Sequence, residues 1–140
     1  MIILASDHAG YELKEYLKTY FDKRNIEYID AGAHSFDPED DYPDIIKSAA
    51  KQMLKNENNK GVFICGSGVG VSMVANRHKG IRAVLAQDVA TAQMARMHNN
   101  ANVLCLGARS ICKKRATNII KTFLTTDFLG GKHQRRIDKF

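Results

Sequence analysis

Short apolar segments alternate along the chain with longer segments in which apolar and polar residues are mixed. The short segments are rich in branched side chains and hold few charges, which is typical of strands that are buried on both faces of a sheet. We therefore predict five strands, at residues 1–6, 26–32, 61–65, 81–86 and 102–108.

In the longer segments, apolar residues recur at spacings of three and four, which is the period of a helix with one buried face. Leu13 and Leu17 give this pattern after the first strand, and Pro43 suits the first turn of the next helix. We expect Gly130 and Gly131 to end the last helix. The remaining helices are predicted at residues 70–78, 88–98 and 110–125.

This alternation predicts an α/β fold in which helices cover both faces of a five-stranded parallel sheet. A chain of 140 residues fits one domain, residues 1–140, with a basic C-terminal tail at about 130–140. Ligands of such sheets bind outside the carboxyl ends of the strands. Residues that directly follow a strand are therefore the first candidates for a functional site.

Composition narrows the class of protein without assigning a function. Hydrophobic residues make up 44% and charged residues 26%, as in ordinary globular proteins, and no apolar stretch is long enough to span a bilayer. The N-terminus has no basic leader and the three cysteines form no framework, so we expect free thiols in the cytoplasm. The net charge of +6 favours an anionic ligand, although residues 37–44 form an acidic loop.

The clearest local signal is the sequence CGSGVGVS at residues 65–72. Its glycines leave backbone N–H groups exposed between a strand and a helix, where they can bind an anion or a developing oxyanion. It lacks the Lys-Ser/Thr of a P-loop and the third glycine of a dinucleotide fingerprint. Cys65 can serve there as a nucleophile or base. A tight structural turn and a buried strand cysteine are the alternative interpretations.

Three titratable residues outside this loop are candidates for proton transfer or binding. Asp7 and His8 follow the first strand, where the sequence changes abruptly from apolar to polar, although Asp7 can equally cap the next helix. His98 lies between a helix and the fifth strand, and it can exchange a proton near neutral pH or simply end the helix. No clustered Cys/His set indicates a zinc site.

Basic residues near the C-terminus are candidates for holding a phosphate. Lys132, His133, Arg135 and Arg136 follow the double glycine, and Arg109 follows the fifth strand. Guanidinium groups suit phosphate oxygens, whereas a solvated terminal face is the alternative interpretation for such a charge run.

Seven motifs occur in order along the chain. They are SDHAG at 6–10, DYP at 41–43, ICGSGVGVSMVANR at 64–77, GIRA at 80–83, HNNANVL at 98–104, LGAR at 106–109 and GGKHQRRI at 130–137. Together they closely resemble type B ribose-5-phosphate isomerases, in the family shared with galactose-6-phosphate isomerase subunits. The resemblance covers essentially the whole chain.

The resemblance implies a Rossmann-like three-layer αβα sandwich and an aldose–ketose isomerase. The implied reaction converts D-ribose 5-phosphate to D-ribulose 5-phosphate in the non-oxidative pentose phosphate pathway. It also implies a homodimer or dimer of dimers with active sites at the subunit interface, and no metal or organic cofactor. Neither nucleic acid nor membrane is expected as a partner.

The resemblance assigns a role to each matched position. Cys65 matches the base that moves a proton between C2 and C1 of the sugar, and His98 matches the acid that assists ring opening. Asp7 and Ser67 match groups that open the ring and orient the substrate. The positions matched to substrate binding are His8, Tyr42, Gly66, Gly68, Val69, Gly70, Asn99, Arg109, Lys132 and Arg136.

Two positions depart from the common pattern of the family. Ser67 stands where Thr is common, and the hydroxyl is retained. Lys132 stands where Arg is common, so it offers a point charge in place of a bidentate fork. Some branches use a carboxylate base elsewhere, and Cys65 places this chain with the cysteine branch.

Three alternatives to a ribose-5-phosphate isomerase stay open at the level of sequence. One is an isomerase of a six-carbon sugar phosphate, such as allose or galactose 6-phosphate. Another is a non-catalytic module that binds sugar phosphates, although binding alone needs no base. Nucleic-acid binding is suggested only by the positive charge, and no reader motif supports it.

Overall fold

The computed structural model describes residues 1–140, which form one five-stranded sheet. Every strand pair is parallel, and the strand order is β2-β1-β3-β5-β4. The predicted α/β fold with a five-stranded parallel sheet is thereby confirmed. The strands are β1 (Ile2–Ser6), β2 (Tyr28–Asp30), β3 (Lys60–Cys65), β4 (Ala83–Leu85) and β5 (Val103–Gly107).

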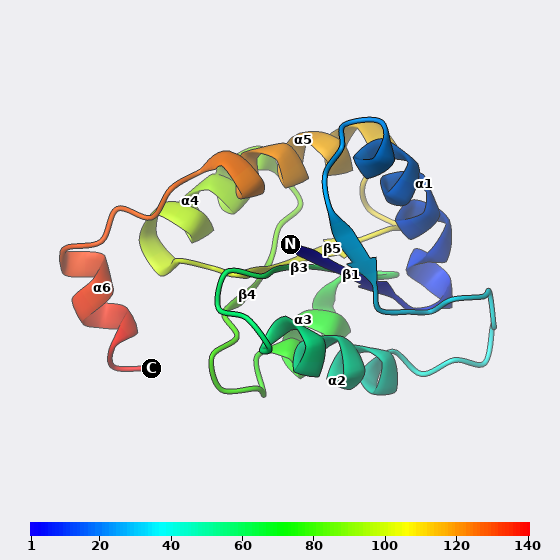
Figure 1. Cartoon of the computed structure of the whole chain (residues 1–140), viewed down its shortest axis with the longest axis horizontal. Helices are drawn as coiled ribbons and strands as arrows, with labels where there is room; N and C mark the ends of the chain where they lie inside the picture. Colours follow the sequence, from blue (N-terminus) through cyan, green and yellow to red (C-terminus); the bar gives the residue numbers. More distant parts are fainter.

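Helices cover the sheet on both faces, as Figure 1 shows. The upper layer in that view holds α1, α4 and α5, and the lower layer holds α2 and α3, which gives the predicted three-layer αβα sandwich. A sixth helix, α6, stands beside the sandwich. The helices are α1 (Tyr11–Asp22), α2 (Tyr42–Met53), α3 (Val69–Ala75), α4 (Val89–Asn99), α5 (Lys113–Thr125) and α6 (Lys132–Ile137), with a short 3-10 helix, η1 (His8–Gly10).

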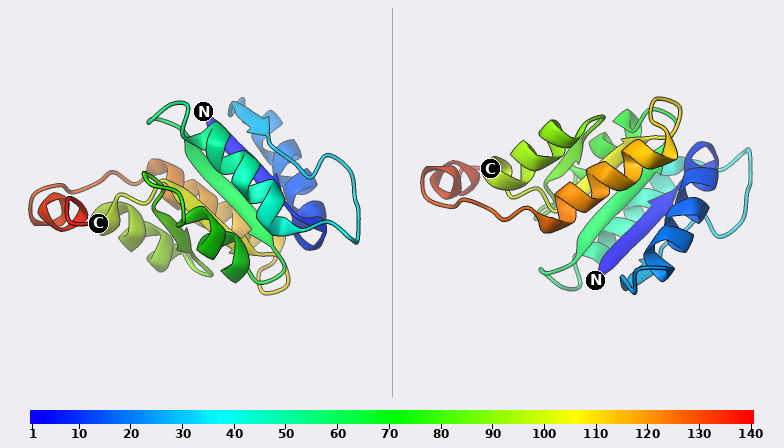
Figure 2. Two further views of the ribbon diagram at one scale, coloured as in Figure 1. Left: turned by 90° about the horizontal axis from the view of Figure 1, so that it is seen from below. Right: turned by 90° about the horizontal axis from the view of Figure 1, so that it is seen from above.

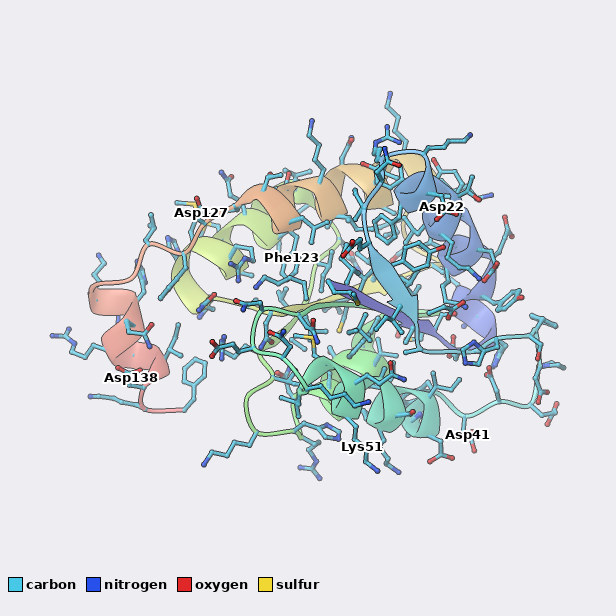
Figure 3. All side chains as sticks on the ribbon, viewed as in Figure 1. Asp22, Asp41, Lys51, Phe123, Asp127 and Asp138 are labelled. Atoms are coloured by element: carbon cyan, nitrogen blue, oxygen red, sulfur yellow. The ribbon has the colours of Figure 1, made fainter.

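The core is divided by the sheet into two buried clusters, because successive strand residues point to opposite faces. Ile2 and Leu4 face the layer of α1, α4 and α5, whereas Ile3 and Ala5 face α2 and α3. Phe123 of α5 is fully buried and points toward the sheet (Figure 3). Burial on both faces therefore requires the near-continuous apolar runs of the central strands β1, β3 and β5.

A buried ion pair fastens α1 to the edge strand β2. The Lys14 side chain is fully buried, and its Nζ lies 2.8 and 2.7 Å from the two carboxylate oxygens of Asp30. Lys18 Nζ donates to the same carboxylate at 2.9 Å. Burial opposes ionisation of Asp30, but hydrogen bonds from these two lysines and from the Gly32 N–H outweigh it and hold the pKa of Asp30 below its ordinary value.

Two expectations about the C-terminal third are corrected by the structure. The helix predicted at 110–125 begins at Lys113 and ends at Thr125, so Gly130 and Gly131 do not end it. Both glycines have positive φ and instead precede α6, where the sequence predicted only a basic tail. Cys112 is exposed at the N-cap of α5.

The helix α6 extends away from the body of the molecule (Figure 2). None of its residues is buried, and the backbone contact that precedes it is a hydrogen bond of 3.1 Å from Leu129 N to Met97 O of α4. None of the helices in the structure combines the length and the apolar character needed to cross a membrane. The protruding helix is basic, and its residues are exposed or half-buried.

Candidate active site

The strand order places a reversal of the chain between β1 and β3. The chain passes from β1 to β2 on one side and then returns to form β3 on the other side of β1. In open α/β sheets, ligands bind at such a switch point, outside the carboxyl ends of the two strands. The residues that follow β1 and β3 meet there, since Asp7 N donates a hydrogen bond of 3.3 Å to Ile64 O.

Cys65 and the glycine loop form the centre of this edge. The Cys65 Sγ accepts a hydrogen bond of 3.1 Å from the Gly68 N–H, which closes the loop around the sulfur. Gly68 has φ +79°, and a Cβ there would lie only 2.5 Å from the Leu85 side chain. Ser67 Oγ accepts the Val69 N–H at 3.2 Å. The sequence therefore folds a glycine-dependent turn that presents a thiol and a hydroxyl together.

The remaining glycines of the loop make room for two flanking side chains. A Cβ on Gly66 would lie 3.0 Å from the Arg109 guanidinium carbon, and one on Gly70 would lie 2.6 Å from the Tyr42 ring. Gly70 is in the first turn of α3, where a backbone N–H has no partner within the helix. Arg109 and Tyr42 thus bracket a stretch of backbone that can donate hydrogen bonds to an anion.

Asp7 is nearly fully buried at the end of β1. Its Oδ1 accepts the Gly10 N–H at 3.0 Å, so it caps η1, as the sequence suggested. Burial raises the pKa of Asp7 because it penalises the charged carboxylate. A carboxyl group in this environment keeps its proton to higher pH than a surface aspartate and is suited to proton exchange.

His8 makes a contact that the sequence did not reveal. Its Nδ1 lies 2.6 Å from Asp40 Oδ1, and the same oxygen accepts the His8 backbone N–H at 3.0 Å. The hydrogen bond to Asp40 raises the pKa of His8. Asp40 belongs to the acidic loop 37–44, but the two residues are too far apart in sequence for spacing to connect them. The composition of that loop was the one available signal.

A second set of candidate residues lies at the end of α4 and on α6. The His98 ring stacks on the His133 ring with centroids 4.5 Å apart and planes 10° from parallel. Burial, followed by the nearby His98, Lys132 and Arg136, lowers the pKa of His133. Asn99, Lys132 and Arg136 are exposed. A cavity of about 490 Å³ lies beside them, lined in part by Arg82, Asn99 and Phe140, and does not include the glycine loop.

The two sets lie at opposite edges of the sheet. Cys65 pairs with Gly107 at the carboxyl end of β5, whereas α4 delivers His98 to the amino end of the same strand. The five residues of β5 alone separate these ends by about 13 Å. Figure 3 shows that Asp41, at the start of α2, and Asp138, after α6, lie on opposite sides of the molecule. One chain therefore cannot join both sets around one small ligand.

The carboxyl edge is the side of the sheet where the parallel strands end, and the amino edge is the side where they begin. The carboxyl-edge group is Asp7, His8, Tyr42, Cys65, Gly66, Ser67, Gly68, Val69, Gly70 and Arg109. The amino-edge group is His98, Asn99, Lys132 and Arg136. No three His, Cys, Asp or Glu side chains come together in an arrangement that could hold a metal ion.

Comparison with known proteins places this arrangement in a family. The family model described as Ribose/Galactose Isomerase matches residues 2–140. The chain belongs to the ribose/galactose isomerase family.

Relatives of this ribose/galactose isomerase family member share most of its length. It is 44% identical over 138 residues to the probable ribose-5-phosphate isomerase B of Mycoplasma pneumoniae, covering 99% of this chain and 91% of the relative. A similar crystal structure is that of ribose-5-phosphate isomerase B from Mycoplasma genitalium with bound ribulose-5-phosphate. It has a TM-score of 0.94 and 44% identity and covers 99% of this chain and 91% of the other. The crystal structure of a ribose 5-phosphate isomerase from Thermotoga maritima has a TM-score of 0.94 and 47% identity, and the match covers 99% of this chain and 94% of the other.

Proposed function

We propose that this ribose/galactose isomerase family member interconverts D-ribose 5-phosphate and D-ribulose 5-phosphate in the non-oxidative pentose phosphate pathway. One observation carries the proposal. The Cys65 thiol, the glycine loop, His8 and Arg109 converge at the topological switch point. Kinship at 44% identity to an isomerase that was crystallised with ribulose-5-phosphate supports the choice of substrate.

In the proposed reaction, the C1 carbonyl of the open-chain sugar makes the C2 proton acidic, but only weakly. Cys65 as thiolate removes the C2 proton, and the C–H electron pair forms the C1–C2 double bond of an enediolate. Backbone N–H groups of residues 66–70 stabilise the developing negative charge on oxygen. The proton returns from Cys65 to C1, and a proton moves from O2 to O1, so a ketone replaces the aldehyde. Oxidation states exchange within one molecule, and the chemistry requires neither metal nor organic cofactor.

Binding energy from the phosphate is proposed to position the reacting carbons. His8 and Arg109 of the carboxyl-edge group would contact this dianion, and Asp7 and Ser67 would orient the sugar during ring opening. Interactions with a remote phosphate lower the entropic part of the barrier by fixing geometry. Tyr42, against Gly70, would line the sugar pocket.

The amino-edge group is proposed to act in the site of a second copy of the chain. Its members are exposed, apart from the half-buried His98, and they lie too far from Cys65 of their own chain to share one small ligand. The partner subunit's His98 would assist ring opening, and the partner subunit's Arg136 and Lys132 would hold the phosphate. Met73 of α3 and Met94 of α4 are exposed and suit burial in a homodimer or dimer of dimers. Free cysteines fit a reducing cytoplasm.

The test is isomerisation of ribose 5-phosphate beside allose 6-phosphate and galactose 6-phosphate, with no metal added and with Cys65→Ala as control. We expect preference for ribose 5-phosphate and loss of turnover in the variant. Preference for a six-carbon substrate would instead identify an isomerase of a six-carbon sugar phosphate. Binding without turnover of any of the three would identify a non-catalytic sugar-phosphate module.

A further inference from the structure

The acidic loop between β2 and α2 reaches across to the end of β1. Asp40 is its contact residue, with Oδ1 at 2.6 Å from His8 Nδ1 and 3.0 Å from the His8 backbone nitrogen. The side chain of Asp40 is only 12% exposed, whereas the loop residues around it are exposed. Its Oδ2 is buried without a hydrogen-bond partner. His8 is therefore the group that balances the buried charge of Asp40.

The same loop is held at a second point and leads directly into the carboxyl-edge group. Phe36 packs edge-on against Tyr11 of α1, with ring centroids 6.2 Å apart. Two residues after Asp40, Tyr42 begins α2 and packs against Gly70 of the glycine loop. Asp40 thus lies between two side chains of the candidate site and links them through a short stretch of backbone.

We propose that Asp40 is a positioning residue that orients His8 and keeps it positively charged, so that His8 Nε2–H donates to the substrate phosphate. The inference rests on the proposed function for the identity of that phosphate. Asp40 itself touches neither the phosphate nor the reacting carbons. It acts through His8.

The choice of ring nitrogen gives the contact its chemical consequence. Asp40 accepts a hydrogen bond and therefore fixes the His8 proton on Nδ1. A neutral His8 in this tautomer presents only a lone pair at Nε2, which cannot donate to phosphate. The imidazolium presents Nε2–H and a positive charge together, and such charge-assisted bonds are stronger than neutral ones. Phosphate recognition by His8 therefore requires its second proton.

The charges around His8 favour that second proton. The hydrogen bond to Asp40 is the main cause that raises the pKa of His8, partial burial opposes it, and the nearby Asp7 adds to it. In the proposed dimer, the partner subunit's Lys132 and Arg136 would face the same phosphate and act in the opposite direction. With Asp40 present, the cation persists to higher pH and phosphate binding is lost only as the pH rises through the raised pKa.

The experiment compares Asp40→Asn with Glu39→Gln, which removes a charge from the neighbouring exposed position of the same loop. Asparagine keeps a hydrogen-bond acceptor for Nδ1–H, so the loop geometry is retained while the carboxylate is lost. We expect the KM for ribose 5-phosphate at pH 7.5 to rise about fivefold in Asp40→Asn, which is less than the loss of a whole charge-assisted hydrogen bond because the asparagine still contacts Nδ1. At pH 5.5 the KM ratio to the parent returns to near one, and kcat changes less than about twofold.

A direct titration separates this inference from the proposed function. His8 is followed by NMR with and without inorganic phosphate, and His8→Gln assigns its resonance. The midpoint of His8 is expected at lower pH in Asp40→Asn than in the parent and Glu39→Gln. Phosphate is expected to raise that midpoint in all three proteins. An unchanged midpoint in Asp40→Asn, or an equal KM change in Glu39→Gln, would overturn the inference. A protein without isomerase activity whose His8 titrates as expected would instead reject the proposed substrate.

Discussion

At the scale of residues, Cys65 and Cys105 show how position decides the chemistry of one side chain. Both face the layer of α2 and α3. Cys105 lies within β5, and burial raises the pKa of its thiol far above the ordinary value, so it stays neutral. Cys65 ends β3, where its sulfur accepts the Gly68 N–H. Only Cys65 combines a sulfur acceptor for a backbone N–H with a place at the switch point.

This contrast gives a prediction with an internal control. Cys65→Ala should lower kcat for ribose 5-phosphate at least about 100-fold, since a positioned general base contributes that much or more. Binding of inorganic phosphate should be largely retained, because His8 and Arg109 are untouched. Cys105→Ala removes a sulfur of equal size from the same face and should keep its turnover. Steady-state kinetics on the parent and the two variants measures kcat, and normal turnover in Cys65→Ala would exclude Cys65 as the base.

Substitution of Arg136 should affect KM, whereas substitution of Cys65 should affect kcat. The Arg136 guanidinium is exposed on α6 and is assigned to the remote phosphate. Arg136→Ala should raise KM about tenfold, the equivalent of one charge-assisted hydrogen bond, and change kcat less. Lys139→Ala removes a nearby exposed positive charge and should leave KM unchanged. Equal effects of the two substitutions would indicate a general field of positive charge instead of a specific contact.

At the scale of elements, the ion pair between α1 and β2 fixes the edge of the sheet next to the site. Asp30 Oδ1 also accepts the Gly32 N–H at 3.0 Å, and Gly32 O accepts the Ser6 N–H at 2.7 Å. Lys14 thereby connects through β2 to the segment that carries Asp7. Lys14 is fully buried, and the Asp30 carboxylate is its closest counter-charge.

Asp30→Asn should therefore destabilise the fold by about 3 kcal/mol, because it leaves the buried Lys14 ammonium with only the more exposed Glu15 carboxylate, 3.2 Å away, as a counter-charge. The pKa of Asp30 is lowered in the fold, so its contribution is present above the unfolded value and is lost as the pH falls through the folded value. Urea unfolding at pH 7 measures the loss. Glu12→Gln breaks an exposed ion pair with Lys113 and serves as the control with little effect. A similar stability for both variants would contradict this role of Lys14.

The predicted elements differ from the observed ones where contacts between residues far apart in sequence determine the structure. The strands and the Cys65 loop followed from apolar runs and glycine spacing, because burial on two faces leaves no other composition. Helix α6 was missed because a double glycine before basic residues looks like a flexible tail. The contact between Asp40 and His8 joins a loop to a strand end, and the periodicity of apolar residues cannot predict such a contact. The family resemblance suggested the roles of His98 and Arg136, but not their place at the amino edge.

At the scale of the whole molecule, the separation of the two edge groups follows from the α/β topology itself. Each helix returns the chain to the amino edge, so residues that end a helix cannot meet residues that end a strand in the same protomer. His98 and α6 lie at one edge, and Cys65 lies at the other. A protein with both groups in one active site must bring two copies together, with the amino edge of one against the carboxyl edge of the other. A two-fold symmetric dimer then contains two equivalent sites.

This arrangement predicts that two inactive variants restore each other. In a mixed dimer of Cys65→Ala and His98→Ala, one site takes its carboxyl-edge group from the His98→Ala chain and its amino-edge group from the Cys65→Ala chain. That site is intact, and the other holds both defects. Random pairing makes half of the dimers mixed, so co-expression should restore about a quarter of the parent activity.

Mixing Cys65→Ala with Asp7→Asn is the control, because both changes lie in the carboxyl-edge group and every site keeps one defect. Isomerase assays on the whole co-expressed population measure this quarter, and mixed dimers purified through two different tags should reach about half of the parent activity. No recovery in the first mixture, or equal recovery in both, would show that the site does not combine residues of two chains.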